Sequence, residues 1–392
     1  MVLMLVLPVC APAAEDTIKI GATEPLSGTF KDIGERYYGG VEYAVKVLNE
    51  SGGLLGKKLE AVPIDSELKP DVAIRKATNL MLKDGVKFFC GGTGSSVGAA
   101  MAVLAEKNNA IMISYGMAAA SLTGKDCRKN FFRVALSTDQ HSYALAVWVA
   151  KQGYKNVATI AQDYSFGKEA TEAFIRKLKK LNPSVKIVAE LYHKIGEKDY
   201  APYVSQLLSA KPDVIFTPNW GNDLTILLKQ SNSFGLKTKF ACYDLYDENV
   251  VKGVADDDYI VGNATSESYM LEIPGAQNKK FVEAFYKDKG YYPTWLHGKG
   301  YTAVMFLAEA IKKAGTTDVD AVIKAWEGLT YESIAGKYYM RPCDHQAQTP
   351  VYVTIMGKGS KFFKHAWGGT PIVIPAEEIA DTCEENGCKM QK

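Results

Sequence analysis

Residues 87–107 read KFFCGGTGSSVGAAMAVLAEK, an apolar strand that runs through a glycine-rich turn into an apolar-faced helix. The start of such a helix offers free backbone N–H groups and the positive end of the helix dipole. With the hydroxyl groups of Ser95 and Ser96, this turn predicts a site for a carboxylate or phosphate oxygen. Residues 94–98 also match the G-x-S-x-G pattern of hydrolases, so this stretch alone leaves open whether Ser96 attacks a substrate or the turn only holds an anion.

Length and composition favour a globular protein with two lobes. The chain has 392 residues, of which 47% are hydrophobic and 23% charged, and its formal net charge is +2. A chain of this length can bury two hydrophobic cores. The weak net charge argues against disorder, nucleic-acid binding and a basic membrane-binding surface. We therefore expect a small-molecule ligand and no nucleic acid, and we expect the protein to be a monomer.

The first residues have the pattern of an export signal. An apolar run over residues 2–9 is followed by Ala-Pro-Ala-Ala at 11–14, a small-residue cleavage site. We expect residues 1–14 to be a signal peptide that is removed on export to the periplasm. A lipid anchor on Cys10 is the alternative, although Val9 is a poor neighbour for a lipidated cysteine. No later stretch has about 20 uninterrupted apolar residues, so we expect the mature chain to be soluble.

The cysteines beyond residue 14 are even in number, which in an exported chain permits disulfides. Cys383 and Cys388 bracket a short polar loop and are the predicted pair. Cys90 with Cys127 is a weaker prediction. Because the chain has no paired C-x-x-C and no H-x-x-x-H, we expect neither a metal nor a cofactor.

Strand-like and helix-like segments alternate along the first two thirds of the chain. The first run has strands at 18–22, 59–64, 86–90 and 110–114; the second begins with a helix around 144–150 and has strands at 156–161, 185–190, 213–217 and 240–243. Two such runs predict an α/β fold of two parallel, doubly wound sheets with helices on both faces. In these folds ligands bind beyond the carboxyl ends of the strands, where Ser95 lies.

The sequence resembles the type I periplasmic binding proteins of the leucine/isoleucine/valine-binding family over nearly the whole mature chain. The resemblance rests on the order of several segments, among them IKIGATEPLSG (18–28), GGVEYAVKVLNESGGLLGKKLE (39–60), NNAIMISYGMAAASLT (108–123), VATIAQDYSFG (157–167) and GEKDYAPYVSQLLSAKPDVIF (196–216). It implies two Rossmann-like lobes joined by three hinge crossings, which close over a small ligand and deliver it to an ABC permease in the inner membrane. By this resemblance the first lobe takes residues 15–134 and 265–341, and the second takes 135–264 and 342–392.

The resemblance also implies ligand contacts in the first lobe. The family's carboxylate-binding serine falls on Ser95, with Ser96 beside it, which agrees with the anion site inferred from the turn. The backbone carbonyl that receives the ligand's ammonium group falls on Gly116. A hydroxyl group two positions later, a threonine in amino-acid binders, is replaced here by Ala118, so one polar contact is absent.

In the second lobe the resemblance implies a pocket that is more aromatic and less polar than in typical amino-acid binders. The family acid that pairs with the ammonium falls on Asp244. A further aromatic position falls in the first loop of the first lobe, near Phe30 or Ile33. The family's tyrosine positions fall on Phe166 and Trp220; Tyr164 could supply a hydroxyl from the loop of Phe166, and Tyr243 and Tyr246 lie near Asp244. A last aromatic position falls in the first lobe, at Trp295 or Leu296 before the helix at 298–313.

These residues favour a carboxylate-bearing ligand whose amine is less well held. A hydrophobic or aromatic amino acid is the first expectation, an aromatic or apolar carboxylate without the amine the second, and a small amide or urea the third. Loss of one buried hydrogen bond costs about 1–3 kcal/mol, which changes affinity by one or two decades. Simpler structural roles stay open, since the serines could only cap the helix and the aromatic residues could lie in the core.

A serine hydrolase is the remote alternative. It would use Ser96 as the nucleophile, with a later acid and one of the five histidines. Against it, Gly91-Gly92-Thr93 separates the strand from the supposed nucleophile turn, and no HGGG-like oxyanion segment is present. We therefore predict a binding protein and not an enzyme, with signalling to a membrane receptor as an alternative to transport.

Overall fold

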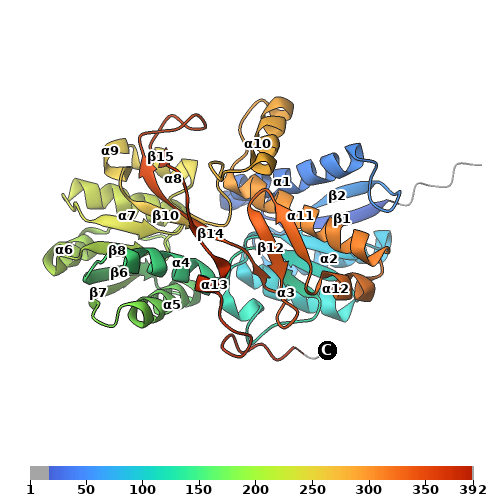
Figure 1. Cartoon of the computed structure of the whole chain (residues 1–392), viewed down its shortest axis with the longest axis horizontal. Helices are drawn as coiled ribbons and strands as arrows, with labels where there is room; N and C mark the ends of the chain where they lie inside the picture. Colours follow the sequence, from blue (N-terminus) through green and yellow to red (C-terminus); the bar gives the residue numbers. More distant parts are fainter. Residues whose placement is uncertain (1–16, 391–392) are drawn as a thin grey trace, which may run out of the picture.

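The computed structural model describes residues 17–390, which form two α/β lobes side by side (Figure 1). The sheet of the first lobe is parallel and has the order β2-β1-β3-β4-β5. Its strands are β1 (Ile18–Glu24), β2 (Leu59–Asp65), β3 (Phe88–Gly91), β4 (Ile111–Ser114) and β5 (Phe131–Arg133). The predicted two-lobed α/β fold is confirmed. The predicted signal peptide and Cys10 lie outside the described residues.

The helices of the first lobe come from both ends of its sequence. Three lie between its strands: α1 (Lys31–Glu50), α2 (Pro70–Asp84) and α3 (Ser95–Lys107). Three more are contributed after the second lobe: α10 (Ala276–Lys289), α11 (Trp295–Ala314) and α12 (Val319–Trp326). In Figure 1 the blue α1 and the orange α11 run next to each other although they are far apart in the sequence.

Two glycines allow α1 and α11 to pack closely. A Cβ atom on Gly40 would lie 2.1 Å from the carbonyl oxygen of His297, and one on Gly300 would lie 2.5 Å from the carbonyl oxygen of Tyr37. Any larger residue would push the helices apart. The close packing brings the rings of Tyr37 and Trp295 to a centroid distance of 6.2 Å at the edge of the lobe.

The second lobe has a larger, mixed sheet with the order β15-β14-β10-β9-β8-β6-β7. Its parallel strands are β6 (Asn156–Gln162), β7 (Lys186–His193), β8 (Val214–Thr217), β9 (Lys239–Cys242) and β10 (Ala264–Glu267). Antiparallel strands continue it: β14 (Val351–Gly357), β15 (Trp367–Gly368) and β16 (Ile372–Ile374). Its helices are α4 (Thr138–Lys151), α5 (Ser165–Leu181), α6 (Ala201–Ala210), α7 (Gly221–Ser233), α8 (Glu248–Val254), α9 (Asp257–Ile260) and α13 (Ala376–Ile379).

The chain passes between the sheets after β5, after β10 and again before β14. A small sheet of β11 (Thr330–Ser333), β12 (Gly336–Met340) and β13 (Ala347–Gln348) precedes the last passage. All of β10 pairs within the second sheet, so the chain returns to the first lobe after Glu267 and not at residue 265. Short helical turns η1 (Gly28–Phe30) and η2 (Ala120–Leu122) complete the first lobe.

The predicted disulfide pairs are wrong. Cys388 is bonded to Cys127 and Cys383 to Cys343, with Cα–Cα distances of 5.6 and 6.2 Å. The tail after α13 runs back over the last crossing, which brings each cysteine to a partner remote in sequence. Cys90 is a free, buried thiol in the central strand β3 and cannot reach the loop that carries Cys127.

The tail is tied to both lobes. Lys151 on α4 pairs with Glu378 on α13 at 3.0 Å, which fixes the start of the tail to the second lobe. The Cys127–Cys388 bond fixes its end to the loop after η2 in the first lobe. The C-terminal segment is therefore a further, covalently anchored connection across the hinge.

Candidate functional site

The candidate site lies where the strand order reverses in each of the two sheets. In the first lobe the strand order reverses between β1 and β3, and in the second between β6 and β8. Ligands of doubly wound folds bind at such points, beyond the carboxyl ends of the strands. Glu24 ends β1 and the 92–96 turn follows β3, while Tyr164 and Trp220 follow β6 and β8.

Ser95 is held ready to donate a hydrogen bond. It is the first residue of α3, is partly buried, and its Oγ accepts a hydrogen bond of 3.1 Å from the backbone N–H of Ala119. Its own hydroxyl proton then remains for another acceptor. Ser96 is exposed on the first turn of the same helix.

Gly116 belongs to the same corner of the site. A Cβ atom at this position would lie 2.4 Å from the hydroxyl oxygen of Tyr37 and 2.6 Å from the carbonyl oxygen of Gly92. The carbonyl oxygen of Ala118 accepts hydrogen bonds of 2.8 Å from both the backbone N–H and the Oγ of Thr138, at the first hinge crossing. The structure therefore brings Ser95, Gly116 and Ala118 together.

A buried carboxyl group lies beneath the 92–96 turn. Glu24 accepts a 2.6 Å hydrogen bond from the backbone N–H of Gly92 and a 2.7 Å hydrogen bond from the hydroxyl of Thr93. Burial raises the pKa of Glu24 to about 7, although hydrogen bonds from Tyr115, Thr93 and the backbone oppose this. Glu24 was not among the predicted site residues, since it lies at the end of β1 and outside the Ser95 turn.

Aromatic side chains form the facing part of the second lobe. The indole N–H of Trp220 donates to the Tyr164 hydroxyl at 3.1 Å, and the Tyr164 and Phe166 rings are 5.7 Å apart. All three are partly buried. The Trp220 ring also lies 5.6 Å from Phe30 of the first lobe, so this group spans the two lobes. Burial raises the pKa of Tyr164 to about 12, which keeps its hydroxyl neutral.

Asp244 lies near a buried ion pair. Burial raises its pKa to about 8; the charge of Glu267 adds to this rise and that of Lys299 opposes it. Glu267 and Lys299 form a 2.6 Å ion pair between the end of β10 and α11, and the Lys299 ammonium lies 4.4 Å from the ring centre of Trp295. Asp244 is therefore mostly protonated at pH 7 in the absence of a cationic partner.

Tyr243 lies deeper than the other predicted residues. Its hydroxyl group donates a 2.9 Å hydrogen bond to the backbone carbonyl of Thr138 and contacts Ser142, and its ring stacks on His141 at 3.8 Å. These contacts are all within the buried part of the second lobe. Tyr243 is thus engaged in the core beside the hinge crossing, although its ring also touches Phe166.

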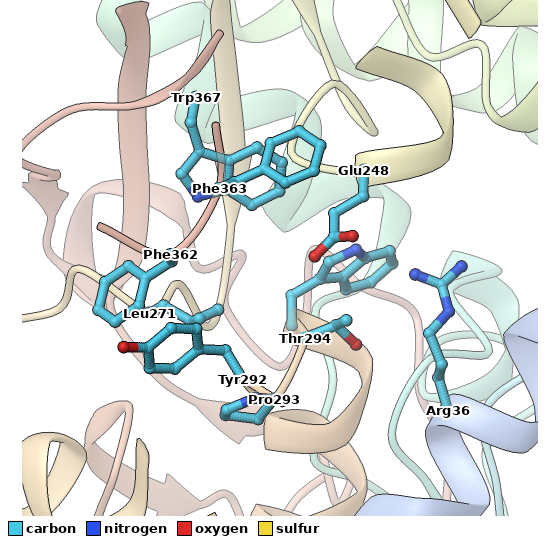
Figure 2. A pocket seen from close by; sticks show the side chains of 10 residues that line it. Arg36, Glu248, Leu271, Tyr292, Pro293, Thr294, Phe362, Phe363 and Trp367 are labelled. Carbon is cyan, nitrogen blue, oxygen red and sulfur yellow. The ribbon is translucent and has the colours of Figure 1, made fainter. Parts of the chain in front are cut away.

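A small pocket lined in part by Trp295 lies between the lobes. Figure 2 shows Arg36 of α1 and Glu248 of α8 on one side of this pocket, and Tyr292, Phe362 and Phe363 on the other. The rings of Tyr292 and Phe362 meet edge to face at 5.1 Å.

Helices α1 and α8 also touch directly across the lobes. Arg36 and Asp247 are 3.3 Å apart, and Asn249 donates to Asp32 at 2.9 Å. The two lobes are thus in contact at this edge of the site.

Comparison with known proteins identifies the family. The sequence profile of the family described as periplasmic binding protein matches residues 17–361. The chain belongs to this family. It is 27% identical over 402 aligned residues to "Leu/Ile/Val-binding protein homolog 4" of Brucella abortus, with 97% of this chain and 94% of the relative covered.

Two solved structures of periplasmic binding proteins are closely similar. One is the leucine-, isoleucine-, valine-, threonine-, and alanine-binding protein of Brucella ovis in its closed conformation (TM-score 0.88, 25% identity, 96% of this chain and 99% of that one). The other is a solute-binding protein of an ABC transporter from Rhodopseudomonas palustris BisB5 in complex with 3,4-dihydroxybenzoic acid (TM-score 0.79, 25% identity, 94% and 100%). This chain is accordingly a type I periplasmic binding protein of the ABC-transporter class.

The structure of this periplasmic binding protein gives Ser96 no histidine partner among residues 17–390. The five histidines contact Ser266, Asn219, Thr294, Glu327 and Asp257 instead. No group of three or more metal-ligating side chains is found among the described residues. None of the helices in this part of the chain has the length and apolar character needed to cross a membrane.

Proposed function

We propose that this protein captures a small carboxylate-bearing ligand between its lobes and delivers it to an ABC permease. The observation that carries the proposal is the Ser95 corner, where a preoriented hydroxyl and a helix N-terminus lie at a switch point of the sheet. The Tyr164–Trp220 pair and Asp244 would close over the other end of the ligand. The family and the chain's similarity to exported binding proteins support a periplasmic location.

A hydrophobic or aromatic amino acid is the first ligand class that we propose. Asp244 and the backbone of Gly116 would receive its ammonium group, while the aromatic residues would cover its side chain. An ammonium close to Asp244 would favour the ionised carboxylate and so offset the effect of burial. The names of the Brucella relatives support this class.

An aromatic carboxylate without an amine is the second candidate. Two features favour it: burial raises the pKa of Asp244 to about 8, and Ala118 supplies no side-chain hydrogen bond. The complex of the Rhodopseudomonas neighbour with 3,4-dihydroxybenzoic acid shows that this fold can hold such a ligand. A small amide or urea is a third candidate with no comparable support.

A thermal-shift panel of amino acids, benzoates and small amides would separate these classes, since a ligand that binds the native state raises its apparent stability. Melting shifts confined to α-amino acids would remove the second candidate. Shifts confined to benzoates would remove the first. A panel in which no compound of any class shifts the melt would refute the proposed function.

Ser95→Ala tests the carboxylate site directly. Removal of a hydrogen bond to a charged group costs about 1.5–3 kcal/mol, so Kd should rise by roughly one to two decades. Ser96→Ala is the matched control, since Ser96 is exposed on the same helical turn, and it should change Kd by less than about threefold. Calorimetric Kd values that are equal for the two variants would reject the assignment to Ser95.

A further inference from the structure

Glu24 occupies an unusual position for an acidic residue. It is fully buried at the end of β1, directly below a turn whose free N–H groups suit an anion. An ionised carboxylate there would repel the carboxylate of a ligand and compete with it for the same donors. The Gly92 N–H and the Thr93 hydroxyl are both already bound to Glu24.

We propose that Glu24 is a positioning residue that shapes the 92–96 turn and becomes protonated when a carboxylate ligand binds. This inference rests on the proposed function. When Glu24 is ionised, the Thr93 hydroxyl donates to its Oε2, as in the observed 2.7 Å hydrogen bond. When the ligand binds, one proton from solvent adds to Oε2. The protonated Oε2 then donates to Thr93 Oγ1, and the Thr93 hydroxyl rotates so that its own proton points toward the ligand.

Proton uptake of this kind balances charge within the site. The ligand brings one negative charge to the turn, and the added proton removes one from Glu24. The carbonyl-type oxygen Oε1 keeps its hydrogen bond from Gly92 throughout, so the backbone of the turn need not move. The neutral acid also avoids two carboxylates in one poorly solvated corner, which is the usual reason that one of such a pair stays protonated.

Among the titratable groups around the 92–96 turn, Glu24 is the one that changes charge. The titratable groups packed around it are Tyr37 on α1, Asp65 at the end of β2, Cys90 on β3 and Tyr115 after β4. Burial raises the pKa values of both tyrosines and of the thiol, which therefore stay neutral near pH 7. Asp65 stays ionised, because hydrogen bonds lower its pKa against the effect of burial.

Binding calorimetry of the full-length protein tests the proposal. L-leucine, L-phenylalanine and 3,4-dihydroxybenzoate serve as probes, in two buffers of different ionisation enthalpy, so that the number of protons taken up can be measured. The matched variant is Glu24→Gln, which keeps an acceptor for Gly92 and a donor for Thr93 but cannot titrate. The difference between wild type and Glu24→Gln isolates Glu24 from Asp244, which would itself release a proton to bind an ammonium.

The wild type should take up close to one more proton per ligand than Glu24→Gln at about pH 8. Glu24→Gln should then bind about tenfold more tightly than wild type at about pH 8 and equally at about pH 6, because the free wild-type protein is mostly ionised only at the higher pH. A probe that binds both proteins with equal proton uptake overturns the inference and leaves the proposed function intact. If no probe binds the wild type, both are overturned.

Variants of Thr93 provide a second test should Glu24→Gln fail to fold. Thr93→Ser keeps the hydroxyl group and Thr93→Val removes it at nearly the same volume. Thr93→Val should bind the probe about tenfold more weakly than Thr93→Ser at about pH 6. At this pH Glu24 is mostly protonated and donates to Thr93, so the Thr93 hydroxyl can donate to the ligand. Equal Kd values for the two variants at this pH overturn the inference.

Discussion

Replacing Asp244 with asparagine should stabilise the ligand-free protein near neutral pH. In the folded chain burial raises the Asp244 pKa to about 8, helped by the charge of Glu267. In the unfolded chain the carboxyl group titrates near its ordinary value of about 4. Between these two values the folded state holds a proton that the unfolded state has lost, so the free energy of unfolding falls as pH rises through this window.

The size of the effect follows from the width of that window. One group contributes at most about 1.4 kcal/mol per pH unit, so raising the pH from about 5 to about 7.5 should cost up to about 3 kcal/mol. We allow about 2 kcal/mol, since Asp244 is only partly buried and water reduces the penalty. Asparagine has nearly the same shape and does not titrate, so Asp244→Asn should lack this part of the pH dependence.

Urea unfolding of ligand-free protein at the two pH values measures the effect. Ligand is removed first by unfolding and refolding. The control is Glu283→Gln, which removes an exposed carboxyl group on α10 and should leave the wild-type dependence unchanged. If Asp244→Asn loses as much stability as the wild type between the two pH values, Asp244 is not the neutral, desolvated acid described here.

Two further predictions follow from other parts of the molecule. Ala118→Thr restores the missing hydroxyl group, and it should lower the Kd of an α-amino acid by roughly tenfold in calorimetry. The Kd of 3,4-dihydroxybenzoate should change by less than about threefold. Equal gains in affinity for both ligands would show that the hydroxyl does not act on the amine. Exchange of both Cys127 and Cys388 for serine should lower the free energy of urea unfolding by about 3–5 kcal/mol. The same exchange of Cys343 and Cys383 should lower it by about 1.7 kcal/mol less, because the first bond closes a separation of 261 residues and the second one of 40. The opposite ranking would contradict the loop-closure explanation.

Local patterns in the sequence were sufficient for the alternation of strands and helices and for the Ser95 turn. Apolar runs ended by glycine or polar residues are short-range signals, so strands such as β6 and β8 were predicted almost to their ends. Helix α4 shows where this fails. It begins at Thr138, ahead of the predicted 144–150. The prediction missed its first turns because they contain polar Gln140, His141 and Ser142, which are buried and hydrogen-bonded at the hinge and do not fit an apolar helical pattern.

The charged part of the site could not be read from the sequence in the same way. The Glu267–Lys299 pair joins residues from different lobes, and neither position carries a motif. Glu24 did leave a signal, since it is an acidic residue at the carboxyl end of an otherwise apolar strand that lies next to β3. The cysteine pairs were missed for a related reason: nearness in sequence was taken as nearness in space, whereas the tail folds back over the hinge.

The Cys127–Cys388 bond also bears on the order in which the protein matures. Cys127 precedes its partner by 261 residues and is therefore made well before it. The first lobe can therefore fold its sheet before residue 388 has been made, and Cys127 stays unpaired until then. A chain cut short before residue 388 would lack this partner, so a free Cys127 thiol marks a molecule without the C-terminal segment.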